Sequence, residues 1–365
     1  MNICLIGDGL ASLSLAKNLI NKNIKVFVYY KNSKKSKFQS RTIGMSKDNF
    51  DFFNKEIIKI KKSMFWKINQ IEIYSEKLKN EKILNFEKFR NDLFVMIKNN
   101  EIYTLLENDL KKNKLFKKIL LKNNQIQKKI INDKKYDLII NCDAYNKISK
   151  FFFNNKITKN YNSYAYTIII KHKKIKNKKA VQIFTKLGPL AFLPISNSET
   201  SIVFSIINKK IILSENEIQN LIIKYNNSYK IKSFSKLEKF KLNFTVSKNY
   251  YYKNLLAFGD ALHKIHPLAG QGFNMTLRDL KILSNIIQNR KDLGLPLDST
   301  IYQDFENKVK HFNFIFSTGI DFIYEFFKVD SRYDNNYLNQ LLKLLGKNKL
   351  FNKFASKFAD QGLII

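Results

Sequence analysis

Several kinds of residue are scarce in this chain of 365 residues, and each scarcity argues against a class of protein. The two cysteines, Cys4 and Cys142, both lie in apolar runs typical of strands, so we expect buried thiols in a reducing cytoplasm and no disulfide framework. A run of about twenty apolar residues is missing, which argues against a transmembrane helix. The chain starts directly with a strand pattern, so no signal peptide is expected.

Arginine and negative charge are scarce as well. The chain has 65 Lys and Arg residues against 30 Asp and Glu, a formal net charge of +35, and only five of the basic residues are Arg. Such a charge is typical of proteins that bind nucleic acid or anionic membranes. Because nearly all of it is Lys, beside abundant Asn and Ile, the base composition of an AT-rich genome explains much of it instead. No nucleic-acid-binding motif is found, so we expect no nucleic acid partner and retain a peripheral contact with anionic lipid.

The chain opens with the pattern of a dinucleotide-binding unit. Residues 3 to 6 predict a strand, residues 13 to 20 carry apolar side chains at helical spacing, and residues 25 to 30 predict a second strand. The loop between the first strand and the helix consists of Gly7, Asp8, Gly9, Leu10, Ala11 and Ser12. This order predicts a Rossmann-like nucleotide site, in which Ser12 stands at the third glycine position and Tyr30 stands where an acidic residue usually ends the second strand.

Residues 255 to 279 are the most informative stretch. A short apolar strand is followed by Gly259 and Asp260, then by a turn with two further glycines, and then by apolar residues at helical spacing from Leu277 to Ile287. Glycine lets backbone N–H groups approach a ligand closely, and the amino end of a helix favours negative charge. The stretch therefore predicts a site for a phosphate, or for a ring that becomes negative on reduction; the alternative is a glycine turn before an ordinary helix.

The same stretch carries the motif Gly259-Asp260-Ala261-x-His263-x-x-His266-Pro267-x-Ala269-Gly270-Gln271-Gly272-x-Asn274. It resembles the second flavin motif of class A flavoprotein monooxygenases, and is most similar to the aromatic-ring hydroxylases of ubiquinone biosynthesis. The resemblance implies that FAD is the cofactor, that Asp260 contacts its ribityl chain, and that Pro267, Gly270 and Gln271 line the isoalloxazine ring. It assigns cofactor binding to Gly7, Gly9, Leu10, Ala11, Ser12, Tyr30, Arg41, Arg90, Asp143, Gly259, Asp260, Pro267, Ala269, Gly270, Gln271, Gly272 and Asn274.

Two weaker motifs support the resemblance. Arg41 begins a segment whose arginine lies near the flavin in that family, and Arg90 falls at a second motif position, although either could be an ordinary surface residue. After a strand at 136 to 141, Asp143 matches the family and Ala144 replaces its glycine, so a plain capped strand end stays open as the alternative. Because a phenol cannot clamp a ribose diol as a carboxylate does, Tyr30 predicts weaker FAD binding than in typical relatives.

The resemblance implies an α/β fold like that of p-hydroxybenzoate hydroxylase: a Rossmann-like FAD-binding domain, an inserted and mostly antiparallel β-sheet substrate domain, and C-terminal helices. We expect the first in residues 1–63, 89–158 and 251–310, the second in 64–88 and 159–250, and the third in 311–365. Alternation in 64 to 88 predicts two or three strands, and a helix is predicted to start at 89 to 93. A phenylalanine-rich helix from His311 is interpreted as core or as the wall of a prenyl tunnel, and residues 349 to 358 as a basic amphipathic helix.

As a function, the resemblance implies an FAD-dependent monooxygenase that hydroxylates the ring of a polyprenylated phenol or quinone precursor of ubiquinone through a flavin C4a-hydroperoxide. It implies NAD(P)H as a transient reductant, contact with the inner face of the bacterial plasma membrane, and a complex with other ubiquinone-biosynthesis proteins. Because the flavin carries the chemistry, no separate catalytic side chain is expected. A metal site formed by His263 and His266 is not expected, because the two residues lie across an irregular turn before Pro267 and no cluster of cysteines or carboxylates accompanies them. The alternatives are an enzyme for another aromatic compound and a non-catalytic relative that binds lipid or partner proteins.

Overall fold

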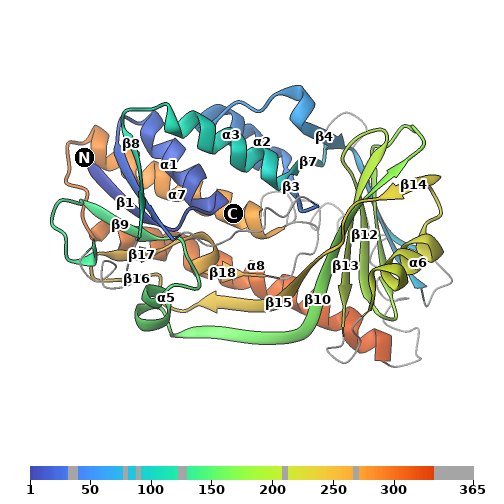
Figure 1. Ribbon diagram of the computed structural model, residues 1–365. Helices are drawn as coiled ribbons and strands as arrows, with labels where there is room; N and C mark the ends of the chain where they lie inside the picture. Colours follow the sequence, from blue (N-terminus) through green and yellow to red (C-terminus); the bar gives the residue numbers. More distant parts are fainter. Residues whose placement is uncertain are drawn as a thin grey trace.

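The protein is built around two large β-sheets that lie side by side (Figure 1). The structure is a computed structural model, and it describes residues 1–31, 40–76, 81–87, 92–121, 130–207, 213–265 and 271–332. A six-stranded sheet contains the strands that precede the two glycine motifs. A nine-stranded sheet forms the other half of the protein, and a three-stranded sheet lies between the two (Figure 1). The predicted glycine motifs and the predicted antiparallel region thus fall on different sheets.

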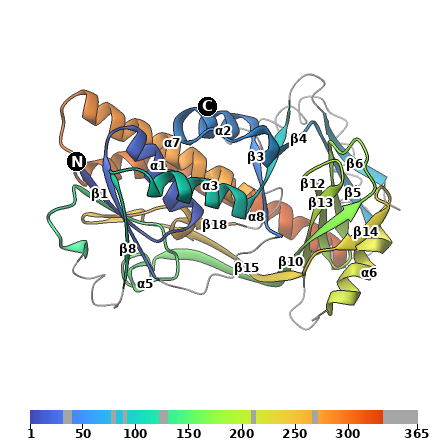
Figure 2. The same cartoon turned by 45° about the horizontal axis from the view of Figure 1, so that its top comes forward.

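The six-stranded sheet has the order β16-β17-β9-β1-β2-β8 and is parallel except for β16. Its strands β1, β9 and β17 are apolar along their length and almost fully buried, because helices cover both faces of a parallel sheet. Figure 2 shows α1, α3 and α7 along one side. The strands are β1 (Asn2–Ile6), β2 (Lys25–Tyr30), β8 (Phe116–Leu120), β9 (Leu138–Asn141), β16 (Tyr251–Tyr252) and β17 (Leu255–Ala257).

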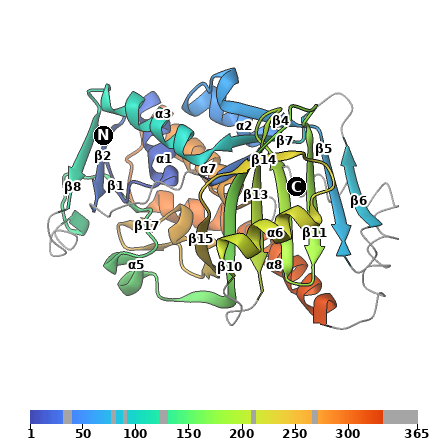
Figure 3. The same cartoon turned by 45° about the vertical axis from the view of Figure 1, so that its right-hand side comes forward.

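The nine-stranded sheet follows the alternating pattern expected of antiparallel strands. In β10, which runs over Lys156–His172, Tyr166, Ile168 and Ile170 face the core under helix α6, whereas Thr167 faces the other way. Figure 3 shows α6 lying across this sheet. The other strands are β5 (Gln70–Ser75), β6 (Glu81–Glu87), β11 (Lys179–Thr185), β12 (Gly188–Pro194), β13 (Glu199–Ile206), β14 (Ile231–Phe234), β15 (Glu238–Ser247) and β18 (His263–Lys264).

The three-stranded sheet corrects one prediction. Its order is β3-β7-β4, with β3 at Thr42–Ser46, β7 at Phe94–Lys98 and β4 at Phe65–Ile68. We expected a helix to begin at 89 to 93, but β7 comes first and the helix α3 begins only at Asn99. The unbroken apolar run of β7 is buried on both faces, which suits a strand better than an amphipathic helix.

The helices of the described residues pack the two sheets into one body. The first half of α8 packs on the six-stranded sheet and its later part on the nine-stranded one, so this helix runs beneath both (Figure 1). In the described part of the chain, none of them is both long and apolar enough to cross a membrane. The helices are α1 (Leu10–Asn21), α2 (Lys47–Phe52), α3 (Asn99–Lys111), α5 (Lys147–Phe152), α6 (Glu215–Tyr225), α7 (Gln271–Asp292) and α8 (Thr300–Arg332), with short turns η1 (Phe53–Ile57), η2 (Lys62–Met64) and η4 (Gly259–Ala261).

The phenylalanine-rich part of α8 does not form a single wall. Phe316 is buried in the core between the sheets, whereas Phe312 is 41% exposed. The side chains of Ile323 and Phe327, and the whole predicted amphipathic helix at 349 to 358, lie outside the described residues. The two cysteines are free and buried, as predicted.

Candidate functional site

The first glycine loop joins β1 to α1 and leaves space in front of Gly9. Gly7 has a φ of +107°, and a Cβ there would lie 3.1 Å from the Cβ of Asp143. A Cβ at Gly9 would meet no described atom within 4 Å. Gly9 precedes α1 with no side-chain cap, and the first turn of α1 holds no acidic residue. The free N–H groups of this helix end therefore face the space in front of Gly9, as a diphosphate requires.

The two predicted glycine motifs meet in space. Gly259 has a φ of +60°, and a Cβ there would lie only 2.7 Å from the Cβ of Ala11. Leu10 and Ala11 are half-buried and Ser12 is fully buried, so the small Ser12 side chain fits where the family has a third glycine. The adjacent Asp260 is exposed on the turn η4 and is free to accept hydrogen bonds from a ligand.

Asn274 ties the start of α7 to the neighbouring segment. Its side-chain Oδ1 accepts hydrogen bonds from the Ser46 backbone N–H at 2.9 Å and from Asn49 at 3.0 Å, and its Nδ2 donates to the Gly44 carbonyl at 2.8 Å. The side chain is 1% exposed. Asn274 therefore holds β3 and α2 against α7, and its amide group has its partners within the protein. Gly272 lies beside it in the first turn of α7, lining the cavity described below.

Asp143 lies in a tightly bonded turn after β9. Its Oδ1 accepts the Tyr145 backbone N–H at 2.8 Å, and its carbonyl accepts the Ser149 hydroxyl at 2.6 Å. Asn146 caps α5 by accepting the Ser149 backbone N–H at 2.8 Å. This network places Asp143 against Gly7, at the edge of the first loop. The roles of Asn146 and Ser149 were not predicted, although an Asn just before a helix is a common N-cap residue.

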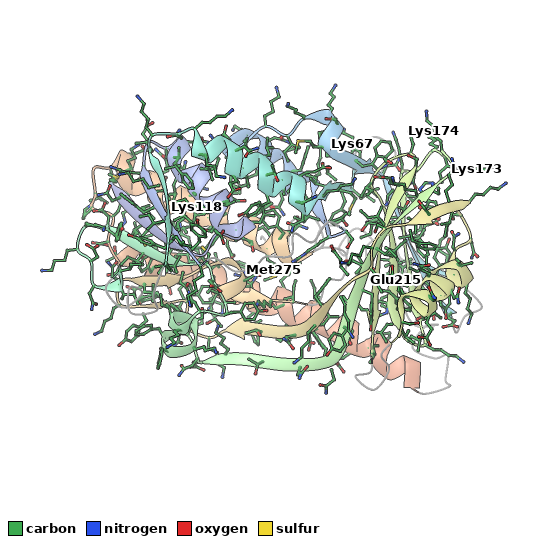
Figure 4. The ribbon with its side chains drawn as sticks, in the orientation of Figure 1. Lys67, Lys118, Lys173, Lys174, Glu215 and Met275 are labelled. Carbon is green, nitrogen blue, oxygen red and sulfur yellow. The ribbon has the colours of Figure 1, made fainter. Side chains whose placement is uncertain are left out.

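At the end of β2, a lysine covers the position where a carboxylate is usual. The Lys118 ammonium lies 4.5 Å from the centre of the Tyr30 ring, 2.6 Å from the Glu107 carboxylate and 3.3 Å from that of Asp8. Burial alone would lower the pKa of Lys118, but the hydrogen bond to Glu107 and the charge of Asp8 raise it above its ordinary value. Figure 4 shows Lys118 on this side of the molecule, among the helices of the parallel sheet. Acidic groups are thus present near Tyr30, on other elements.

A mostly apolar cavity of about 160 Å³ lies between the nine-stranded sheet and the start of α7. The polar side chains that line the cavity are Arg41, Thr42, Thr167 and Gln182. The Arg41 guanidinium lies 5.8 Å from the centre of the Phe240 ring. Of the residues that line the cavity, Arg41 and Gly272 were predicted from the sequence to bind the cofactor. The remaining lining residues are Ile43, Gly44, Ile68, Ile71, Phe94, Met96, Ala180, Val181, Leu193, Val203, Phe240, Ile265, Gly272 and Phe273.

A buried polar pair supports α7 from below. His263 Nε2 lies 2.7 Å from Asp279 Oδ2, and Asn313 donates to Asp279 Oδ1 at 2.9 Å. Burial lowers the pKa of the neighbouring Arg278 to about 10, although Asp279 opposes the effect, and its guanidinium lies 4.1 Å from the Phe316 ring. His263 thus serves the packing of α7. No group of three or more metal-ligating side chains occurs in the described ranges.

Several predicted residues cannot be placed. Arg90, His266, Pro267, Ala269 and Gly270 lie outside the described residues, and of Gln271 the structure describes the backbone, as the first residue of α7. Most of the remaining predicted cofactor residues form two adjoining groups, one around Gly9 and Gly259 and one at the cavity, whereas the Asn274 side chain is bonded within the protein and Tyr30 lies under Lys118. The first group fits a flavin nucleotide, since it offers an open glycine cradle, a helix amino end and the exposed Asp260 carboxylate.

Comparison with protein families gives a match over more than half of the chain. The sequence model of the squalene epoxidase family matches residues 135–345. The chain is 23% identical over 239 residues to the mitochondrial ubiquinone biosynthesis monooxygenase COQ6 of Caenorhabditis elegans, covering 53% of each protein. It is 31% identical over 153 residues to the 3-demethoxyubiquinol 3-hydroxylase of Escherichia coli (strain K12), covering 39% of this chain and 38% of that protein. The chain therefore spans about half or less of the length of these curated relatives.

Solved structures share the fold at low sequence identity. PqsL, a probable FAD-dependent monooxygenase from Pseudomonas aeruginosa, superposes with a TM-score of 0.72 at 11% identity, over 94% of this chain and 99% of its own. The p-nitrophenol 4-monooxygenase PnpA from Pseudomonas putida gives 0.75 at 10% identity, over 100% and 98%. HpxO from Klebsiella pneumoniae, solved with FAD and uric acid, gives 0.74 at 10% identity, over 98% and 97%. The predicted fold, like that of p-hydroxybenzoate hydroxylase, is confirmed.

Proposed function

Because the chain belongs to the squalene epoxidase family and, with the ubiquinone hydroxylases, to the FAD-dependent monooxygenases, we propose that it is an FAD-dependent aromatic hydroxylase. Its proposed substrate is the ring of a polyprenylated phenol or quinone precursor of ubiquinone. The observation that carries the proposal is the cavity of about 160 Å³ beside the start of α7. A cavity of that size holds about one aromatic ring. A prenyl tail would therefore lie outside it.

Different residues would bind the cofactor and the substrate. The Gly7–Gly9 loop and the start of α1 would hold the diphosphate, and Asp260 the ribityl chain. The first turn of α7 would face the isoalloxazine ring, since Gly272 and Phe273 line the cavity. When bound, FAD supplies the oxygen-activating chemistry, with NAD(P)H as the proposed transient reductant. The protein excludes water through the apolar lining and orients the ring through Arg41, Gln182 and Thr167.

A basic and aromatic surface around α5 supports contact with an anionic membrane. Tyr145 is 74% and Phe151 69% exposed, and residues 144 to 159 and 248 to 254 contain no Asp or Glu. Burial and the nearby charge of Lys264 lower the pKa of Lys156, so positive charges crowd here. The exposed lysines of this surface are Lys147, Lys150, Lys248 and Lys253. Each lysine near an anionic bilayer contributes about 1 kcal/mol, and aromatic rings suit the headgroup level.

The membrane proposal has its own test. Sedimentation with vesicles of anionic lipid should capture the protein, and the double variant Lys147→Glu and Lys150→Glu should weaken capture. Vesicles of zwitterionic lipid provide the control. Equal capture of both proteins would place the contact elsewhere. We propose the inner face of the bacterial plasma membrane as the location, together with other ubiquinone-biosynthesis proteins as partners.

A second candidate function is a non-catalytic relative that binds lipid or partner proteins. It is favoured by Tyr30, since no carboxylate ends β2 and Lys118 covers the ring. The visible spectrum of the purified protein separates the two, because oxidised flavin absorbs visible light. An enzyme should be yellow and should oxidise NAD(P)H faster when a phenol is added; a colourless and inactive protein would favour the second candidate.

Asp260 sharpens this test. The variant Asp260→Ala should lower FAD affinity about tenfold or more, which corresponds to ~1.4 kcal/mol. Since Asp260 is exposed, thermal stability of the apoprotein should not change. The matched control is Asp51→Ala, which removes an exposed carboxylate paired with Lys47 on α2. Equal flavin retention in both variants would contradict the assignment of Asp260.

A further inference from the structure

We propose that Thr167, Ser40 and Glu238 form a proton-transfer path that leads from the substrate cavity to the carboxylate of Glu238. The inference rests on the proposed function, because that function supplies the phenol whose proton would travel along the path. It assigns a role to three side chains that neither the glycine motifs nor the flavin chemistry uses. Ser40 and Glu238 do not line the cavity; Thr167 does.

The distances define a continuous chain of hydrogen bonds. Thr167 Oγ1 lies 2.7 Å from Ser40 Oγ, and Ser40 Oγ donates to Glu238 Oε2 at 2.5 Å. The Ser40 backbone N–H donates to the same oxygen at 3.2 Å, which fixes the position of the carboxylate. Thr167 and Ser40 are each 2% exposed, so bulk water does not interrupt the chain. Glu238 is half-buried and lies at the outer end.

The donors and acceptors of this chain have a fixed order. A serine hydroxyl has one proton, and two acceptors lie within reach of it: the Glu238 carboxylate at 2.5 Å and the Thr167 backbone carbonyl at 3.2 Å. The ionised carboxylate is the nearer and stronger acceptor and can only accept, so the Ser40 proton goes to Glu238. Ser40 must therefore accept from Thr167. Thr167 then keeps its lone pairs for a donor on the cavity side, which is what a phenol O–H offers.

The fold explains how three distant residues meet. Thr167 on β10 lies directly across the strand pair from Glu238 on β15, in the antiparallel register of these strands. Ser40 comes from the segment that leads into β3, one residue before Arg41. The same segment thus brings a cation to the cavity and the Ser40 hydroxyl to Thr167, which lines it. A cation near a phenol favours its ionised form, so Arg41 lowers the cost of removing the proton.

The step is balanced in atoms and charge. The phenol proton passes to Thr167 Oγ1, the Thr167 proton passes to Ser40 Oγ, and the Ser40 proton passes to Glu238, leaving a phenolate in the cavity and a neutral carboxylic acid. No electrons are exchanged. Because a phenol holds its proton far more tightly than a carboxylate, with ordinary pKa values of about 10 and about 4.3, Glu238 passes the proton on to solvent. The phenolate ring is richer in electrons and therefore accepts oxygen more readily.

The test measures phenol ionisation and does not depend on turnover. FAD-loaded protein is mixed rapidly with 4-nitrophenol, at a pH below the pKa of the free phenol, and the yellow nitrophenolate is followed in time. Thr167→Val and Glu238→Gln should each slow its appearance by about 100-fold, the scale of a lost proton-transfer group. Thr167→Ser keeps the hydroxyl and should restore most of the rate. Ser205→Ala is the matched control, because it removes a buried hydroxyl on β13 that no hydrogen bond among the described residues joins to the path.

The outcomes separate the path from the proposed function. Wild-type rates in both Thr167→Val and Glu238→Gln would overturn the path while leaving phenol binding, and so the proposed function, intact. A wild-type protein that binds FAD but no phenol in an equilibrium titration would overturn both. A rate in Thr167→Ser as low as in Thr167→Val would show that shape matters and not the hydroxyl, and would also overturn the path. If Thr167→Val loses its flavin through misfolding, Glu238→Gln decides the question.

Discussion

The two large sheets build their parts of the site in opposite ways. On the six-stranded sheet, the functional features are backbone features: Gly9 with open space in front of it, and Gly259 pressed against Ala11. On the nine-stranded sheet, they are side chains that alternate along strands, such as Thr167 and Val203, with the intervening residues buried under α6. A cofactor that is the same in many proteins can be held by backbone, whereas a substrate that differs between proteins is met by side chains that are free to vary.

The largest expected effect comes from a substitution in the part of the site that is built from backbone, on the six-stranded sheet. Gly259→Ala forces a left-handed residue and a Cβ at 2.7 Å from that of Ala11, so the free energy of unfolding should fall by about 3 kcal/mol and flavin should be lost. Gly9→Ala is the matched control, since its φ is −72° and its Cβ meets open space. It should leave apoprotein stability unchanged and weaken FAD binding by about tenfold. Denaturant titration and flavin fluorescence measure the two effects, and equal stability losses would contradict the contrast.

The second prediction concerns the far end of the nine-stranded sheet. Glu72 is 3% exposed and accepts hydrogen bonds from Lys179 and Tyr74, each at 2.8 Å, and from Lys82. Burial raises the pKa of Glu72, but these three partners outweigh it and leave the pKa below its ordinary value. Glu72→Gln should therefore cost about 2 kcal/mol at neutral pH.

The pH dependence of this loss follows from the direction of the shift. A carboxyl group whose pKa is lowered by folding stabilises the protein above its unfolded pKa of about 4.3 and loses that contribution as the pH falls through the folded value. The difference between wild type and Glu72→Gln should thus be largest near neutral pH and shrink in acid. Urea unfolding at several pH values checks it; a difference that grows in acid would refute the assignment.

The smallest expected effect lies at the substrate side. Val203→Phe adds a ring to a cavity of about 160 Å³, so KM for a phenolic substrate should rise about tenfold while FAD affinity stays the same. Ile223→Phe, on the exposed side of α6, is the matched control and should change neither. A change in FAD affinity with Val203→Phe would show that the two sheets are not as separate as their construction indicates.

The same contrast governs what could be predicted from the sequence. The glycine loops were recognisable because a residue without a Cβ, at the junction of a strand and a helix, has few other uses. The parallel strands β1 and β2 were equally clear, since one is a short apolar run before the first glycine loop and the other is a short, mostly apolar run after the helix that follows this loop. In these loops, the residues expected to bind the cofactor are the same residues that determine the local backbone conformation.

The cavity could not be predicted in this way. Its lining comes from strands whose neighbours in the sheet are far apart in the chain, such as β5 beside β11, with Ile71 opposite Ala180. No spacing in the sequence indicates that pairing. The same holds for Asp279 and His263, sixteen residues apart, and for Glu238 and Ser40, which meet only in the folded protein. A helix was predicted to start at 89 to 93 and to continue through β7, whose unbroken apolar run shows the period of neither a helix nor a half-buried strand.

The strand β10 has one more consequence for how a substrate reaches this protein. It runs from Lys156, whose ammonium donates to the Ala261 carbonyl near the cofactor turn at 3.3 Å, to His172 in the nine-stranded sheet, with one shift of register against β15 between Asn160 and Ser163. It is hydrogen-bonded to β15 along most of that length. An opening of the two halves would have to bend β10 and β15 together, unlike in proteins whose domains are joined by a few hinge residues. We therefore expect the distance between the two sheets to stay constant through each catalytic cycle.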